Sequence, residues 1–234
     1  MTKRFNNSIL KGRMGNVVFY EYNGKQCMRT VAQHIKNPRT PAQQLQRAKL
    51  REATQWFKPL VEVNKLGFVE AGKTMCFRRA VSTAMANAMD VIDGRPCINV
   101  SQASVAHGNL APMVDGMMST HPRPVSENDG QQMLEQVQHM SQHDEKTITI
   151  TWSPNAKGIR SRANDQLVWV LYDIEHDKVV SNAQCSPKPQ RHHGSCLVTW
   201  PPEMEPGTYH VYTFFINADA TKSSDSVYLG EVVL

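Results

Sequence analysis

The segment GFVEAGKT, from Gly67 to Thr74, fits the phosphate-loop pattern G-x-x-x-x-G-K-S/T. In such a loop, backbone amides wrap a phosphate at the N-terminus of a helix, and the lysine reaches the outer phosphates. This chemistry requires a buried strand before the first glycine, but the preceding KPLVEVNKL follows a predicted helix and is interrupted by Glu62 and Lys65. An acidic residue between the two glycines would also repel a phosphate. We therefore keep nucleotide binding at Gly67–Thr74 only as a remote alternative.

The other residues capable of chemistry form weaker patterns. His139 and His143 are four residues apart, a spacing that puts two metal-ligating imidazoles on one face of a helix, but their polar surroundings favour solvated histidines. The chain has five cysteines without a C-x-x-C pair, which argues against a disulfide framework and a zinc ribbon. It has no Gly-x-Ser-x-Gly nucleophile elbow. We therefore predict that the protein is not an enzyme and has no catalytic residue, metal or cofactor.

Charge is divided unequally along the 234 residues. Residues 1–99 hold 17 Lys and Arg against 6 Asp and Glu, whereas residues 100–234 hold 9 against 15. This asymmetry predicts two domains with different partners, or two halves that attract each other. Nowhere is there the run of ~18 to 20 apolar residues that spans a bilayer, nor a secretory signal, so we expect a soluble, cytoplasmic protein.

A β-hairpin is predicted near the N-terminus. GNVVFYEYNGKQCMRTV consists of two apolar runs around Asn23-Gly24, the sequence preferred in two-residue hairpin turns. With this turn, one face carries the opposed pairs Tyr22 and Lys25, Tyr20 and Cys27, and Val18 and Arg29. The other face carries Val17, Phe19 and Met28, and we expect it to face the core.

Two helices are predicted next. The first should run from about Pro41 to Lys58, with Thr40 as N-cap. Its expected buried side consists of Leu45, Ala48, Ala53, Trp56, Phe57 and Leu60. The second, KTMCFRRAVSTAMANAMDVI, has apolar residues at helical spacing and should end at Gly94. Its expected buried side consists of Phe77, Ala80, Val81, Ala84, Met85, Ala88 and Ile92.

From Lys146 onward the hydrophobic period becomes two, and six short runs are separated by Pro, Gly, Asn and Asp. TITITWSP and MEPGTYHVY resemble the fibronectin type III and immunoglobulin-like class. That resemblance implies Trp152 as the core tryptophan and Tyr209 as the tyrosine that closes a corner. The predicted fold class is α+β, with a basic hairpin-plus-two-helix domain (residues 1–96) and a β-sandwich domain (146–234). Residues 97–145 would connect them and could add a strand to the sandwich.

A wider resemblance covers nearly the whole chain. KGRMGNVVFYEYNGKQCMRT, KNPRTPAQQLQR and SDSVYLGEVVL resemble an uncharacterised family of Bacteroidetes proteins with the signature Asn-Pro-Arg-Thr-Pro-Ala-Gln. The resemblance implies neither an activity nor catalytic positions. It also implies no retained phosphate loop in the segment that matches GFVEAGKT.

The basic N-terminal region carries the functional hypotheses, because cations interleaved with aromatic rings suit nucleic acid or an acidic partner. The candidate binding residues are Arg13, Tyr20, Tyr22, Lys25, Arg29, Lys36, Arg39, Arg47 and Arg51. There are two alternatives: these charges are simply solvated, or they form a contact surface for the acidic domain or for a neighbouring subunit. We predict a structural or assembly protein, of mobile-element or virion-associated type, that forms homo-oligomers. The second hypothesis is an accessory protein that binds DNA or RNA; neither includes a membrane or a small-molecule substrate.

Overall fold

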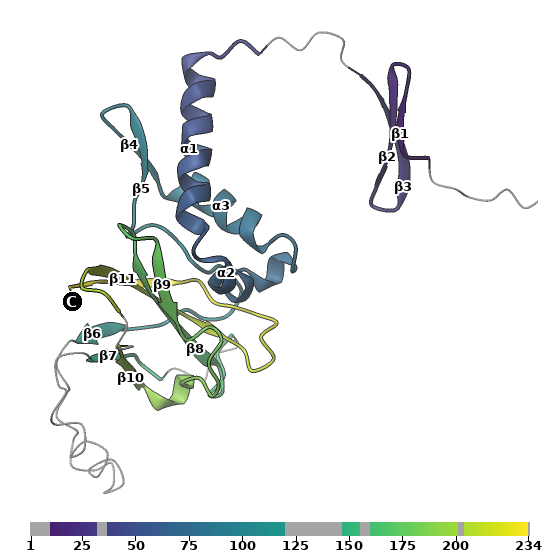
Figure 1. Ribbon diagram of the computed structural model, residues 1–234. Coiled ribbons are helices and arrows are strands. Elements are labelled where there is room, and N and C mark those ends of the chain that lie inside the picture. Colours follow the sequence, from purple (N-terminus) through teal and green to yellow (C-terminus); the bar gives the residue numbers. More distant parts are fainter. Residues whose placement is uncertain (1–9, 32–36, 120–146, 155–159, 201–203, 234) are drawn as a thin grey trace, which may run out of the picture. The chain divides into compact units, whose positions relative to one another are not determined.

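The computed structural model describes residues 10–31, 37–119, 147–154, 160–200 and 204–233 (Figure 1). It divides into two compact units, Met1–Pro41 and Ala42–Leu234. The changes of charge and periodicity along the sequence predict a domain boundary at residue 96. The structure instead separates the N-terminal strands from the two long helices, because those helices bury their apolar sides against a sheet of the second unit. The secondary structure is mixed, with helices and antiparallel sheets.

The first unit contains a three-stranded antiparallel sheet, in the order β1-β2-β3. Its strands are β1 (Gly12–Met14), β2 (Val17–Tyr22) and β3 (Lys25–Thr30). Asn23 and Gly24 have φ values of 50° and 73°, the left-handed conformations that the predicted turn needs. Tyr22 pairs with Lys25 and Tyr20 with Cys27. The predicted hairpin and its register are confirmed, whereas β1 was not predicted.

Two antiparallel sheets of the second unit share one core. One has the order β12-β11-β8-β9 and the other β10-β7-β6. The strands are β6 (Met117–Ser119), β7 (Thr147–Thr151), β8 (Gln166–Asp173), β9 (Lys178–Ser181), β10 (Ser195–Thr199), β11 (Thr208–Ile216) and β12 (Val227–Val233). Ile148 and Ile150 of β7 pack in one cluster with Leu171 of β8 and Phe215 of β11. The sheets therefore lie face to face, each contributing alternate residues.

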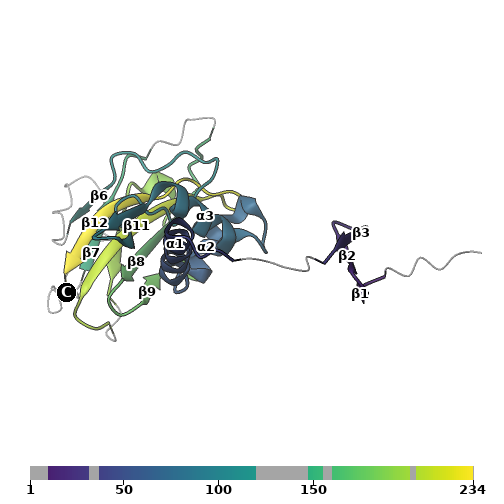
Figure 2. The same cartoon turned by 90° about the horizontal axis from the view of Figure 1, so that it is seen from above.

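The opposite face of the four-stranded sheet is covered by helices (Figure 1 and Figure 2). They are α1 (Pro41–Phe57), α2 (Val61–Gly67), the short 3-10 helix η1 (Val69–Ala71) and α3 (Cys76–Asn87). Trp56 of α1 packs edge-on against Tyr172 of β8 and Tyr212 of β11, with ring centroids 5.1 and 6.2 Å apart. The Tyr172 hydroxyl also donates a hydrogen bond to the Trp56 carbonyl, at 3.1 Å. β8 and β11 are therefore buried on both faces.

The first helix begins where predicted and ends one residue early, at Phe57. Ala53, Trp56 and Phe57 are buried, but Leu45 and Ala48 in its first half are only half-buried. The N-terminal half of α1 thus carries apolar side chains without a complete cover.

The prediction for the second helix was wrong over its last turns. α3 ends at Asn87, and the chain continues as a hairpin of β4 (Met89–Ile92) and β5 (Arg95–Ile98). Asp93 and Gly94 have φ values of 50° and 75°, the same turn geometry as Asn23 and Gly24. Ile92, expected on the buried side of a helix, is 63% exposed on a strand. The Asp-Gly turn outweighs the helical spacing, because two left-handed residues cannot continue a helix.

The two aromatic residues implied by the sandwich resemblance occupy the expected surroundings. Trp152 is 5% exposed between the sheets, and its Nε1 donates to the carbonyl oxygen of Arg191 at 2.7 Å. The Tyr209 hydroxyl donates to the Glu205 carbonyl oxygen at 3.0 Å, four residues upstream. Both rings therefore hold non-strand backbone against the core.

None of the helices in the described part of the chain is both long and apolar enough to cross a membrane.

Candidate macromolecular interaction surfaces

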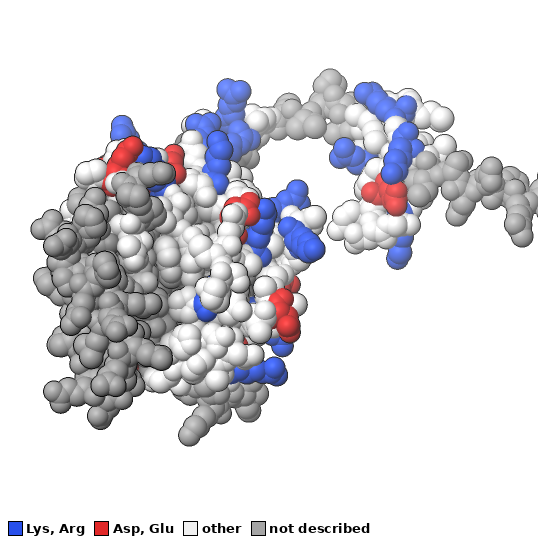
Figure 3. Space-filling model, turned by 60° about the horizontal axis from the view of Figure 1, so that its bottom comes forward, with Lys and Arg blue, Asp and Glu red and all other residues white. Residues whose placement is uncertain are grey.

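One face of the N-terminal sheet collects five of the predicted binding residues. Directly opposed residues of antiparallel strands share a face, and alternate residues along a strand do too. Arg13 of β1 and Arg29 of β3 both pair with Val18 of β2. We call this the cationic face; it comprises Arg13, Val18, Tyr20, Tyr22, Lys25, Cys27 and Arg29. Figure 3 shows basic side chains gathered over this sheet.

The cationic face carries no acidic residue. Glu21, the only acidic residue of the three strands, points to the other face and forms an ion pair with Lys11, with a nitrogen–oxygen distance of 3.0 Å. Tyr22 is 65% exposed and Tyr20 is 40% exposed. Arg13 donates from Nε to the Gly15 carbonyl oxygen at 2.9 Å, which fixes one end of its guanidinium. The face thus offers three cations and two accessible rings.

The opposite face, which we call the apolar face, was expected to be the core side of the hairpin. It comprises Met14, Val17, Phe19 and Met28, together with Gly12, Glu21, Gln26 and Thr30. The expectation was wrong, because none of residues 10–31 is buried. Met14 and Met28 are each 72% exposed. The sheet therefore has a hydrophobic face but no core beneath it.

The remaining predicted binding residues are not on this sheet. Lys36 lies outside the described residues, and Arg39, with a φ of 46°, lies just before α1. Arg47 and Arg51 are one helical turn apart and exposed on α1, in the second compact unit. The structure thus brings together five of the nine candidates, whereas Arg39, Arg47 and Arg51 lie before or on α1.

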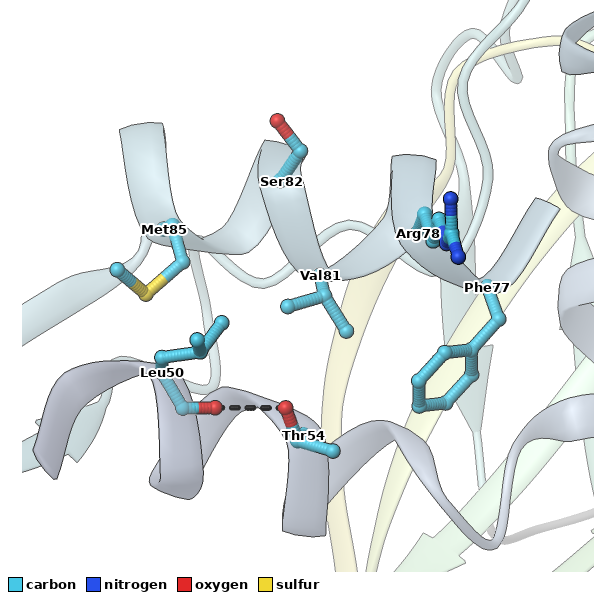
Figure 4. A pocket seen from close by; sticks show the side chains of 7 residues that line it. All are labelled: Leu50, Thr54, Phe77, Arg78, Val81, Ser82 and Met85. Atoms are coloured by element: carbon cyan, nitrogen blue, oxygen red, sulfur yellow. Dashed lines mark hydrogen bonds between the residues drawn. The ribbon is translucent and has the colours of Figure 1, made fainter. Parts of the chain in front are cut away.

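A second candidate surface is a groove between α1 and α3 (Figure 4). Its volume is about 410 Å³, and it is lined by Leu50, Thr54, Phe77, Arg78, Val81, Ser82 and Met85. Leu50 and Thr54 project from one helix toward Val81 and Met85 of the other. The Thr54 hydroxyl is turned back onto its own helix, where it donates to the Leu50 carbonyl at 2.7 Å. We call this the α1–α3 groove; its lining is mainly apolar and includes no acidic residue.

Beyond α3 lies a more polar cavity of about 640 Å³, which shares Arg78 and Ser82 with the groove. Arg79 also lines it, and neither arginine forms an ion pair with any residue that the structure describes. On its far wall, His107 Nδ1 lies 2.7 Å from an Asp225 carboxylate oxygen. This arginine pair was not predicted, although two adjacent arginines on an amphipathic helix were an available signal.

The segment that matches the phosphate-loop pattern forms part of the same cavity wall. It begins at Gly67, the last residue of α2, passes through η1, and precedes α3, which begins only at Cys76. The strand that a phosphate loop requires before its first glycine is therefore replaced by a helix. Gly67 instead lies so close to the Val105 carbonyl oxygen that a Cβ atom would collide with it, which explains the glycine by packing. The Glu70 side chain accepts hydrogen bonds from the Asn109 backbone and side-chain amides, so it is committed to a neighbouring loop.

A further polar cluster surrounds Asp173, at the end of β8. Burial acts to raise the pKa of this carboxyl, but hydrogen bonds from His176 and from backbone amides outweigh it and lower the pKa. The pKa of His176 is raised by its hydrogen bond to Asp173, at 2.6 Å, and by the carboxylate charge. The turn is thus closed by a partly exposed ion pair.

The described residues contain no group of three or more side chains able to hold a metal ion. His139 and His143 lie outside those residues.

No curated protein matches this sequence, and no solved structure does. The family described as "Family of unknown function (DUF6266)" matches residues 9–132 and 128–230. Because these matches include the N-terminal sheet, the helices and both sheets of the second unit, the chain belongs to the Family of unknown function (DUF6266).

Proposed function

We propose that this protein is a non-enzymatic structural or assembly protein that acts through contacts with other macromolecules, including copies of itself. The observation that carries the proposal is the N-terminal sheet, in which none of residues 10–31 is buried. A small sheet needs a covered hydrophobic face to be stable in water. Yet its two faces differ sharply, one apolar and one cationic with tyrosines. A sheet with this pattern and no core of its own is suited to pack against another molecule.

The second unit would present a further surface. We infer that it belongs to the immunoglobulin and fibronectin type III class. The sheet orders β10-β7-β6 and β12-β11-β8-β9, the buried Trp152 and the Tyr209 hydrogen bond support this assignment. A bacterial, cytoplasmic setting and a virion-associated or mobile-element role complete the proposal, by analogy with assembly proteins of this design.

Sedimentation of the purified chain tests the proposal, because a defined oligomer is expected. A strictly monomeric protein that co-purifies with no macromolecule from its native host would contradict it. Turnover of a small molecule that survives repeated purification would contradict the non-enzymatic part.

Nucleic-acid binding is the second candidate, and the acid-free cationic face favours it. Arg13, Lys25 and Arg29 would neutralise phosphates while Tyr20 and Tyr22 stack on unpaired bases. In a gel shift with single-stranded DNA or RNA at ~50 mM salt, Arg29→Ala and Tyr22→Ala should weaken binding, and added salt should abolish it. Met28→Ala, on the other face, is the matched control. No shift of the wild-type chain at low salt would remove this candidate.

A further inference from the structure

We propose that the apolar face of the N-terminal sheet docks into the α1–α3 groove of a second copy, and that the exchange is reciprocal. The inference rests on the proposed assembly function and names its surfaces. Each copy would give its sheet to the other's groove and receive the other's sheet in return. Such an exchange of identical elements closes as a two-fold dimer.

Both surfaces expose apolar side chains that have no cover in their own unit. Met14 and Met28 of the sheet are each 72% exposed, and Leu50 at the groove is 49% exposed. Phe19 of the sheet and Phe77 of the groove are half-buried. Contiguous exposed apolar surface of this kind marks contact sites for other chains. Sheet-on-helix packing would cover both at once, as it does where α1 lies on β8.

Charge determines which face of the sheet can dock. Arg78 lines the groove, and Arg51 lies exposed on the same helix as Leu50. The cationic face would therefore meet like charges, which disfavours that orientation. The apolar face carries a single charged side chain, Glu21, whose charge is balanced by its ion pair with Lys11. This face therefore brings no net positive charge toward Arg78. When the apolar face is docked, the cationic face remains exposed to solvent and available for nucleic-acid binding.

The size of the contact favours exchange over a simple pairing of two sheets. Strands β2 and β3 have six residues each and are ~20 Å long, whereas the three-residue β1 is ~10 Å long. With strands ~4.8 Å apart, one face has a footprint of about 240 Å². Two sheets packed face to face would cover two such footprints, about 480 Å². Reciprocal exchange covers four, about 960 Å², which is close to the ~1,000 Å² expected of a specific interface.

Three glutamate substitutions at exposed positions of the full-length chain test the inference by sedimentation velocity over a range of concentrations. Met28→Glu puts a charge on the apolar face, and Leu50→Glu puts one at the groove. Each should raise the dimer dissociation constant roughly 30-fold or more, as expected for a charge at the centre of an interface. Tyr22→Glu is the matched control on the cationic face, at 65% exposure against 72% for Met28, and should leave the dimer intact. Near-ultraviolet circular dichroism checks that the second unit stays folded.

Mixing the two defective variants separates exchange from other arrangements. A dimer of one Met28→Glu chain and one Leu50→Glu chain retains one undamaged sheet-on-groove contact, so the mixture should dimerise more than either variant alone. No recovery on mixing would overturn the reciprocal exchange. A wild-type oligomer that neither substitution weakens would overturn the inference but leave the assembly function standing. A wild-type monomer at every concentration would overturn the inference and remove self-association from the proposed function.

Discussion

The buried guanidinium of Arg191 offers a sharp test of how two loops of the second unit are held against its four-stranded sheet. Arg191 is 1% exposed, and its Nε donates to Asp165 Oδ2 at 3.1 Å. Its other nitrogens donate to the carbonyl oxygens of Ala111, at 2.7 Å, and Pro112, at 3.4 Å. The guanidinium carbon lies 3.8 Å from the centre of the Phe215 ring. One side chain thus joins β11, the loop before β6 and the loop before β8.

Arg191→Met should remove this junction while keeping a long, flexible apolar side chain. The change leaves the Asp165 carboxylate buried with only the Arg162 backbone amide as a partner, at 2.9 Å. Its second oxygen already lacks a hydrogen-bond partner. Removing one member of a buried ion pair typically costs about 3 to 5 kcal/mol. We expect a loss of that size, a large part of the ~5 to 15 kcal/mol by which domains are stable.

Urea unfolding followed by tryptophan fluorescence measures the loss, because Trp152 donates directly to the Arg191 carbonyl. Arg162→Met is the control, since it removes the same charge from an exposed side chain nearby and should change the free energy of unfolding by less than about 0.5 kcal/mol. If Arg191→Met costs less than about 1 kcal/mol with an unchanged slope, this account of the buried pair is refuted.

Three further predictions concern single side chains. Tyr209→Phe removes the hydroxyl that donates to Glu205, and urea unfolding should show a loss of about 1 kcal/mol; an unchanged midpoint would mean that the bond contributes nothing. The contribution of His176 to the free energy of unfolding should be full below pH ~6.5 and should be lost as the pH rises through its raised pKa. The contribution of Asp173 should be lost as the pH falls through its lowered pKa. Thermal unfolding of His176→Ala should therefore differ most from wild type at mildly acidic pH, and an equal difference at all pH values would contradict the ion pair. Calorimetry should detect no tight ATP binding, and Lys73→Ala should change nothing; tight binding lost in that variant would restore the phosphate loop.

Local turn chemistry made part of the fold predictable. Asn23-Gly24 determined the hairpin and its register, because the preferred turn leaves only one pairing of the flanking residues. The same chemistry at Asp93-Gly94 was overlooked, since the apolar spacing of α3 continued through the hairpin by coincidence. Over a single turn, apolar residues at helical spacing do not distinguish a continued helix from a hairpin, whereas two successive residues with positive φ do.

Tertiary packing was beyond the reach of the sequence pattern. The apolar face of the N-terminal sheet alternates like any core-facing hairpin, and nothing in that alternation reveals that its own unit supplies no cover. Periodicity likewise could not place β1 beside β2, although this pairing brings Arg13 to the cationic face. Arg191 was not singled out either, because an arginine beside two histidines resembles a solvated loop. Its burial depends on Asp165, which is 26 residues away.

Hydrogen exchange of the backbone amides in β2, measured at several protein concentrations, tests the central claim most directly. If the N-terminal sheet packs against another copy, these amides should be protected at high concentration and should exchange rapidly on dilution, while β8 and β11 stay protected throughout. Protection of β2 that is equal at every concentration, or absent at all of them, would contradict the account.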